Sequence, residues 1–206
     1  MGDQGQTKCL ISHGVIPQLA KLIEHSKKTI RRNTAWALSN MAAEPPEEIQ
    51  CLIDAGVFPL LFARISREEF TVQKEILWTC HNALSGGNDN QIQYLIEEGV
   101  IPCVCEMATA AVDEAVITVA LDDVCLVLEW GERVGRLGDT MDLVESCGGL
   151  EKLEDLTGHP SDEVYQMAYR LVERYFGIDY DAEQDSLMDE QAMDLSKDEE
   201  TSDQVL

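Results

Sequence analysis

The sequence predicts an all-α protein built from stacked helical repeats, and three observations support this fold class. The stretch Val72–Val104 repeats the earlier stretch Ile30–Leu61, with Trp78 aligned to Trp36 at a spacing of 42 residues. Apolar residues recur at steps of three and four, as in helices that bury one face. No stretch alternates apolar and polar residues as a half-buried strand does. Repeats of about 40 residues with two or three helices each are typical of armadillo and HEAT arrays.

The first repeat unit contains three helices, each bounded by a recognisable signal. A short apolar helix at 6–13 ends at Gly14, and Pro17 then starts a second helix at 17–25. Proline suits this place because the first N–H groups of a helix have no intrahelical partner. The third helix, at 27–41, carries the motif Trp-x-x-x-Asn.

The later units repeat this order of helices. Pro45-Pro46 and Gly86-Gly87 break the connections between units, and Gly-Val-x-Pro returns at Gly56 and Gly99, 43 residues apart. Ser161 is expected to cap the closing helix. The expected helices are 47–55, 56–66 and 68–84, then 89–98, 99–111 and 113–131, and finally 139–147, 150–157 and 161–176.

Composition divides the chain into a helical domain, residues 1–177, and an acidic segment, residues 178–206. We expect four repeats in the domain, at about 6–42, 47–84, 89–131 and 139–177. The segment 178–206 holds eleven acidic residues and one lysine. Because it offers few apolar side chains to bury, it is expected to be disordered.

Charge and cysteine content exclude several classes of protein. The formal charge is −24, of which the acidic segment carries −10, leaving −14 for residues 1–177. Such a charge disfavours binding to nucleic acid or anionic membranes and favours basic partners. No run is long enough to span a membrane, and the N-terminus has no apolar signal region. The seven cysteines occupy apolar helical positions, which indicates a reducing compartment rather than a disulfide framework.

Two Trp/Asn pairs are the main candidates for a binding site. Trp36 and Asn40, and likewise Trp78 and Asn82, are four residues apart, so each pair shares one face of its helix. Stacked third helices about 8–10 Å apart would present these side chains every two or three residues along an extended peptide. An Asn amide can bind peptide N–H and C=O groups, and Trp rings can hold Lys or Arg stems. Glu75 can receive the charged head. Alternatively, the tryptophans belong to the core and the asparagines are solvated.

At these residues the sequence resembles importin-α (karyopherin alpha), the adaptor for classical nuclear localisation signals. The resemblance runs from Gln6 to about Phe176 and is strongest in VQKEILWTCHNALSGGNDNQIQYLIEEGVIPCVCEM and CGGLEKLEDLTGHPSDEVYQMAYRLVERYFG. It implies the last four of ten armadillo repeats, in a right-handed superhelix (α-solenoid) with an acidic tail. The resemblance also assigns the minor signal-binding site to Trp36, Asn40, Trp78, Asn82 and the acidic Glu75.

The chain departs from the family pattern at several places. Asn33 stands where a second acidic residue is expected, and His81 replaces a usual serine. Leu126 stands where the family has another polar residue, so the series of Trp/Asn pairs ends after two. Each pair, with the residue that stands three positions before its Trp, is called a rung. The basic segment that engages importin-β and the six repeats of the major site are absent from this sequence. The chain is expected to be either a fragment or a truncated member of the family.

The remaining candidate sites are weaker. Lys27-Lys28 with Arg31-Arg32 could form a basic patch, but four cations at a helix start are more often solvated surface. Cys103-x-Cys105 is interpreted as core rather than a zinc site, because no histidine stands at ligand spacing. Cys80 and His81 are sequence neighbours, and adjacent helical residues do not face each other. No metal or cofactor is expected, and an enzyme is disfavoured.

The sequence therefore predicts a nuclear import adaptor that works in cytoplasm and nucleus and binds Lys/Arg-rich localisation signals. The resemblance also implies that an export receptor of the importin-β superfamily contacts the last repeat, where Tyr165, Tyr169, Glu173 and Phe176 form a stripe. Closure of the helical stack alone is the other interpretation of these residues. Two further classes stay open, namely a generic armadillo interaction scaffold and an enzyme that uses a cysteine thiolate.

Overall fold

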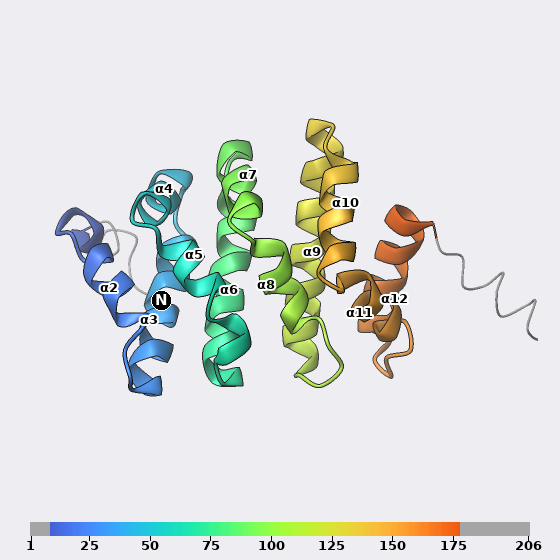
Figure 1. Cartoon of the computed structure of the whole chain (residues 1–206), viewed down its shortest axis with the longest axis horizontal. Coiled ribbons are helices and arrows are strands. Elements are labelled where there is room, and N and C mark those ends of the chain that lie inside the picture. Colours follow the sequence, from blue (N-terminus) through green and yellow to red (C-terminus); the bar gives the residue numbers. More distant parts are fainter. Residues whose placement is uncertain (1–8, 178–206) are drawn as a thin grey trace, which may run out of the picture.

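The computed structural model describes residues 9–177 as helices stacked side by side along one axis (Figure 1). Helix follows helix from one end of the array to the other, and no strand occurs among the described residues. Residues 9–12 are helical, and the later elements are α2 Ile16–Leu22, α3 Lys28–Ala42, α4 Pro46–Asp54, α5 Val57–Phe62, the 3₁₀ helix η1 Ile65–Arg67, α6 Phe70–Gly86, α7 Asp89–Glu97, α8 Val100–Met107, α9 Glu114–Val134, α10 Leu137–Ser146, α11 Gly149–Leu156, α12 Asp162–Leu171 and the π-helix η2 Val172–Phe176. The acidic segment 178–206, expected to be disordered, lies outside the described residues.

The long helices α3, α6, α9 and α12 form one row, in which each packs on the next. The shorter helices α2, α5, α8 and α11 lie in front of this row in Figure 1, joined to it by α4, α7 and α10. The core is continuous through the array, and residues such as Leu38, Leu77 and Leu121 are fully or almost fully buried in successive long helices. This arrangement is the helical solenoid that the repeat period predicts.

Glycine and proline explain where the short second helices begin. Gly56 and Gly99 have φ angles of 65° and 100°, a left-handed backbone that residues with a Cβ rarely adopt. The chain therefore turns sharply there before α5 and α8. Pro59 and Pro102 follow in the first turn, where a missing N–H removes no intrahelical bond. The repeated Gly-Val-x-Pro element is thus a turn followed by a helix start.

Several helices end earlier than the sequence indicated. The helix expected at 17–25 stops at Leu22, and the one expected at 99–111 stops at Met107. The helix expected at 56–66 ends at Phe62, and the chain continues as η1. No glycine or proline marks this last break, and Ile65 of η1 is buried, with η1 packed against α6 and α8. The closing helix changes at Val172 from α to π geometry.

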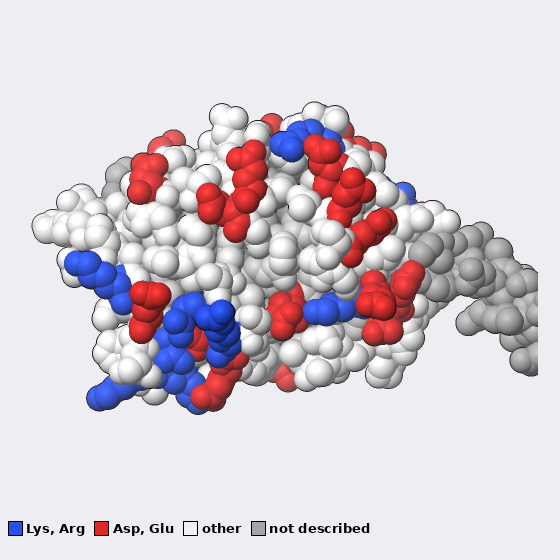
Figure 2. Space-filling view, in the orientation of Figure 1, with Lys and Arg blue, Asp and Glu red and all other residues white. Residues whose placement is uncertain are grey.

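Charge is unevenly distributed over the fold. Figure 2 shows Lys and Arg gathered over the ends of α3 and α6 that lie lowest in the view. The sequence explains this, because residues 75–132 contain no Lys or Arg but eleven acidic residues. We call the cationic residues around the starts of α3 and α6 the basic edge: Lys27, Lys28, Arg31, Arg32, Arg64, Arg67 and Lys74.

Within 9–177 no single helix combines the length and apolar character needed to cross a membrane. One pair, Pro46–Asp54 with Val57–Arg67, reaches that composition only together and is bent by 69° at its break.

Candidate peptide-binding face

The first Trp/Asn pair lies on α3 and is open to solvent. Trp36 is 57% exposed, although tryptophan is among the side chains most often covered in folded proteins. Asn40 is also exposed, and its Nδ2 donates to the Trp36 carbonyl oxygen at 2.9 Å. The Asn40 amide oxygen and its second N–H hydrogen remain available to a ligand. An exposed indole beside an amide is a surface suited to peptide contact.

The second pair, on α6, is tied more closely to the protein. Trp78 is half-buried and meets the ring of His81 edge-on, with ring centroids 5.6 Å apart. Asn82 donates from Nδ2 to the carbonyl oxygen of Ser39 on α3, at 2.8 Å. This bond joins the two long helices and orients the Asn82 amide. The structure therefore places the two rungs on neighbouring helices but gives them different surroundings.

The acidic residue of the second rung already has a partner. The Glu75 side chain is 14% exposed, and its Oε1 lies 3.6 Å from Nε of Arg32, whose own side chain is 54% exposed. Arg32 comes from α3, one repeat earlier. A lysine of a bound peptide would therefore share Glu75 with Arg32 or displace it. The sequence places Asn33 at the matching position of the first rung, and Asn33 is exposed.

His81 is held by a buried carboxyl group that sequence reasoning missed. His81 Nδ1 lies 2.8 Å from Oδ1 of Asp123 on α9, and Asp123 is fully buried. Burial raises the pKa of Asp123 to about 7, and the hydrogen bond to Asp123 raises the pKa of His81. The other oxygen, Oδ2, has no hydrogen-bond partner among the described residues. The two residues are 42 positions apart, the repeat period, which is the signal that links them.

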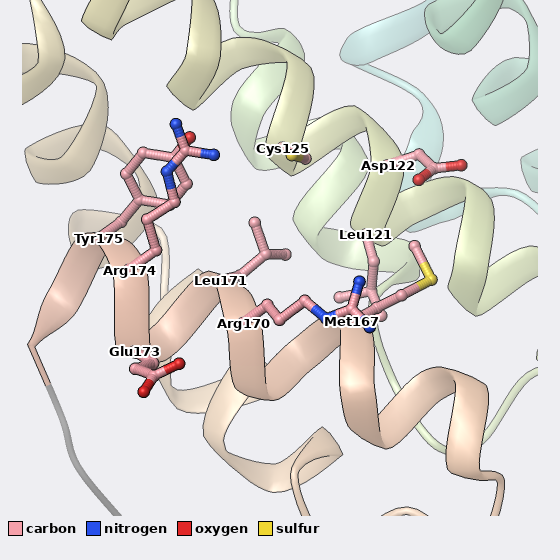
Figure 3. Close-up of a pocket in the computed structure, with 9 residues that line it drawn as sticks. All are labelled: Leu121, Asp122, Cys125, Met167, Arg170, Leu171, Glu173, Arg174 and Tyr175. Atoms are coloured by element: carbon pink, nitrogen blue, oxygen red, sulfur yellow. The ribbon is translucent and has the colours of Figure 1, made fainter.

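After the second Trp/Asn pair, the next long helix, α9, borders a cavity. Leu126 on α9 is half-buried, and a cavity of about 470 Å³ opens between α9 and the closing helix (Figure 3). Arg174 lies 4.8 Å from the Tyr175 ring centroid and pairs with Glu132 at 2.7 Å. The residues that line the cavity are Leu121, Asp122, Cys125, Met167, Arg170, Leu171, Glu173, Arg174 and Tyr175.

The aromatic stripe expected on the closing helix is divided. Tyr165 and Tyr169 are both half-buried, and their ring centroids lie 5.9 Å apart. Glu173 follows in the π turn and lines the cavity, whereas the two tyrosines do not. A π turn holds more residues than an α turn, so the three- and four-residue steps counted from the sequence do not continue through it.

Three of the seven cysteines, Cys80, Cys103 and Cys105, are buried, whereas Cys9 is exposed. Cys80 and Cys103 have sulfur atoms 3.8 Å apart and are both buried. Hydrogen bonding with Cys103 and burial both raise the pKa of Cys80, so Cys80 stays a thiol. The half-buried Cys147 differs, because hydrogen bonding with Cys105 lowers its pKa to about 6. Within residues 9–177, no group of three or more His, Cys, Asp or Glu side chains is arranged to hold a metal ion.

Comparison with known proteins agrees with the helical-repeat fold. Residues 3–43 match the family model described as "Armadillo/beta-catenin-like repeat", and residues 139–190 match "Atypical Arm repeat". A designed armadillo repeat protein, solved in complex with the peptide (KR)4, is 30% identical with a TM-score of 0.69. That match covers 84% of this chain and 70% of the designed protein. The chain is therefore an armadillo-repeat protein.

Among armadillo-repeat proteins, the chain is similar in sequence to importin subunits alpha. Importin subunit alpha-1b of Oryza sativa subsp. japonica is 34% identical over 181 residues, which cover 85% of this chain and 34% of the relative. Importin subunit alpha-5 of Arabidopsis thaliana is 35% identical over 163 residues, which cover 78% of this chain and 31% of the relative. The chain is thus an importin-α-like armadillo protein. It spans about a third of the length of these relatives.

Proposed function

We propose that this protein is a nuclear import adaptor, present in cytoplasm and nucleus, that binds extended Lys/Arg-rich localisation signals. The observation that carries the proposal is the exposed Trp36 indole beside Asn40, followed on the next long helix by Trp78 and Asn82. Aromatic rings and amides on successive helices suit a peptide whose backbone is held by amides and whose cationic stems lie on the rings.

The relatives and the charge distribution support the same ligand class. The relatives are named importin subunit alpha, and the designed neighbour was solved with a peptide of alternating Lys and Arg. The formal charge of −24 attracts cationic peptides over distances of about one Debye length, roughly 8–10 Å at physiological salt. Glu75 lies between the two rungs in sequence and, once released from Arg32, supplies a local anionic partner.

Calorimetric titration of the full chain with a lysine-rich signal peptide, at low and at physiological salt, tests this proposal. Binding is expected at both, and weaker at the higher salt. Trp78→Ala is expected to weaken binding by about 1–2 kcal/mol, through loss of an aromatic contact with a cation. Trp36→Ala should weaken it less, because Glu75 stands one turn before Trp78 and Asn33 occupies the matching place before Trp36.

Two controls make the titration decisive. A peptide of the same length with glutamine in place of lysine should not bind, and circular dichroism must show that each variant keeps its helical content. Equal losses for the two tryptophan variants would show that Glu75 has no role. Absence of binding by the folded parent would overturn signal recognition and leave an armadillo interaction scaffold as the function.

The closing repeat supports a second contact in the same cycle. Tyr165 and Tyr169 lie together on α12, and Glu173 is exposed at the edge of the neighbouring cavity. We propose this end as the contact for an export receptor of the importin-β superfamily. Pull-down of the full chain by such a receptor with its GTPase should succeed for the parent and fail for Tyr165→Ala with Glu173→Ala. Failure of the correctly folded parent would contradict this contact.

A further inference from the structure

The basic edge is a cationic surface on a strongly acidic protein, and part of it has no anionic partner among the residues that the structure describes. Exposed Lys27 and Arg67 and half-buried Lys74 form no ion pair with any residue of 9–177. The other four members pair with only three carboxylates. Counting the seven cations against these three carboxylates, the edge keeps a surplus of positive charge.

A buried network holds the edge in a fixed geometry. Glu68 is 7% exposed and accepts from Arg31 Nε at 2.7 Å and from Arg64 Nε at 2.7 Å. Lys28 pairs with Glu69, which joins the start of α3 to the start of α6. Because both helix starts are linked in this way, the unpaired cations present one preorganised surface.

An acidic segment of this same chain is the partner that fits. The segment 178–206 has eleven acidic residues and one lysine. An acidic macromolecule in solution would have to approach a chain of formal charge −24, which repels it. The chain's own segment is already attached at Gly177, so its effective concentration near the fold is of millimolar order.

The geometry allows the segment to reach the edge. It continues from Gly177, directly after the closing helix, and α12, α9, α6 and α3 pack in that order. With neighbouring helices about 8–10 Å apart, α3 lies roughly 25–30 Å from α12. Because Gly177 follows the end of the closing helix whereas the edge lies at the starts of α3 and α6, the segment also has to run back along a helix length of roughly 22–25 Å. A coil of the length of 178–206 has a root-mean-square span of about 30 Å, and its extended length is about 100 Å.

The cations nearer to Gly177 offer no comparable surplus. Arg174 pairs with Glu129 and Glu132, and Lys152 lies 3.6 Å from Glu106. Arg170 lines a cavity that two carboxylates, Asp122 and Glu173, also line. Near Gly177 the positive charges are therefore matched or outnumbered by carboxylates. The basic edge is thus the favoured surface for an acidic segment.

We propose that the segment 178–206 docks on the basic edge of its own chain through its Asp and Glu side chains. The docked segment neutralises the edge and shields it from other polyanions. This contact uses other residues than the Trp36 and Trp78 rings that signal-peptide binding uses, and the two surfaces meet only at Arg32, which lies 3.6 Å from Glu75.

Cross-linking of the full chain with a zero-length carbodiimide, which joins Lys amines to carboxyl groups in contact, tests the proposal. Mass spectrometry should find links from Lys27, Lys28 and Lys74 to acidic residues of 178–206. Links to Lys21 and Lys152 should be several-fold fewer, although Lys152 stands on α11, which packs against the closing helix. High salt should remove the links to the edge.

Two further arms complete the test. Arg67→Glu should reduce the links at Lys27 and Lys28 several-fold, whereas the matched control Arg133→Glu, on α9 outside the edge, should leave them unchanged. An equal mixture of ¹⁴N and ¹⁵N chains should give links within one isotope only. Mixed-isotope links would instead assign the edge to the segment of a second copy. Equal linking of all five lysines, or none to the segment, would also overturn the proposal.

Discussion

Residues of the candidate peptide-binding face are partly engaged by the protein itself. Asn82 donates one amide hydrogen to Ser39, and Glu75 lies close to Arg32, whereas Trp36 stays open. Each engaged group has to leave, or share, its present partner when a ligand arrives. The partners, more than the motif residues, therefore set the affinity of each rung.

Replacing Arg32 with glutamine should strengthen binding of a lysine-rich peptide. Arg32 competes with the peptide for Glu75, so its removal frees the carboxylate. The expected gain is two- to fivefold, about 0.5–1 kcal/mol, since an exposed ion pair contributes no more than this. Calorimetry of the variant beside the parent measures the gain.

Arg133→Gln is the matched control for that experiment. The Arg133 side chain is 56% exposed and pairs with Asp89 on α7, so the variant changes the net charge equally without touching Glu75. A similar gain in both variants would mean that overall charge, rather than release of Glu75, controls affinity. Adding Glu75→Gln to Arg32→Gln should cancel the gain.

The His81–Asp123 pair should make stability depend on pH. Both pKa values are raised in the folded protein, so the folded state holds more protons and stability falls as pH rises through about 7. The lowered pKa of Cys147 acts in the opposite sense over this range. The informative quantity is therefore the difference in the free energy of unfolding between the parent and Asp123→Asn.

Between about pH 6 and about pH 8, the free energy of unfolding of the parent should fall by about 1 kcal/mol relative to that of Asp123→Asn. Urea unfolding followed by circular dichroism measures it. Asp142→Asn, at an exposed position of α10, is the matched control and should show no such shift. A difference between parent and Asp123→Asn that is constant with pH would show that the buried carboxyl keeps no extra proton.

At the scale of elements, some helix starts can be read from the sequence, whereas side-chain contacts between helices cannot. Gly56 and Gly99 start helices through a backbone angle, which any reader of the sequence can anticipate. Ser161 occupies the expected N-cap position, but its side chain makes no capping bond and donates instead to Glu114 on α9. The hydroxyl thus joins the closing helix to the preceding repeat.

Gly131→Ala should destabilise the fold by about 1–3 kcal/mol. A Cβ at Gly131, in α9, would overlap the buried Thr140 side chain of α10 and lie 3.2 Å from the Arg136 carbonyl oxygen. Gly138→Ala in α10 is the matched control, because no heavy atom lies within 4 Å of its Cβ position. That control should be neutral or stabilising by up to about 1 kcal/mol. Urea midpoints compare the two, and equal midpoints would show that α9 and α10 can separate at no cost.

At the scale of the whole molecule, charge repulsion is the dominant electrostatic term. The chain has 39 acidic and 15 basic residues, and the stretch 75–132 is acidic throughout. Exposed ion pairs such as Arg133–Asp89 contribute little in comparison. Repulsion among unpaired carboxylates therefore opposes the compact state, and salt should relieve it.

Raising sodium chloride from low to physiological concentration should increase the melting temperature by about 2–4 °C, which corresponds to about 1 kcal/mol for a chain of this size. Differential scanning calorimetry checks this. The double variant Glu98→Lys with Asp142→Lys, at two exposed positions, should melt higher at low salt and gain less from salt. A melting temperature that falls with salt would show that ion pairs outweigh repulsion.

The sequence by itself determined the architecture. The 42-residue spacing of the Trp motifs and the 43-residue spacing of the Gly-Val-x-Pro elements fixed the repeat, because each unit must bury its apolar face against the next. Helix ends were less predictable where no glycine or proline marks them, as after Phe62 and Met107. Tertiary packing, rather than local propensity, decides those ends.

Only the tertiary structure decided how the candidate site is engaged. His81 and Asp123 are 42 residues apart, and Asn82 and Ser39 are 43 apart, so the repeat period brings each pair onto neighbouring helices. Whether such side chains touch depends on how each helix is rotated and tilted against the next. That rotation follows from the packing of the whole core, and no single stretch of sequence contains it.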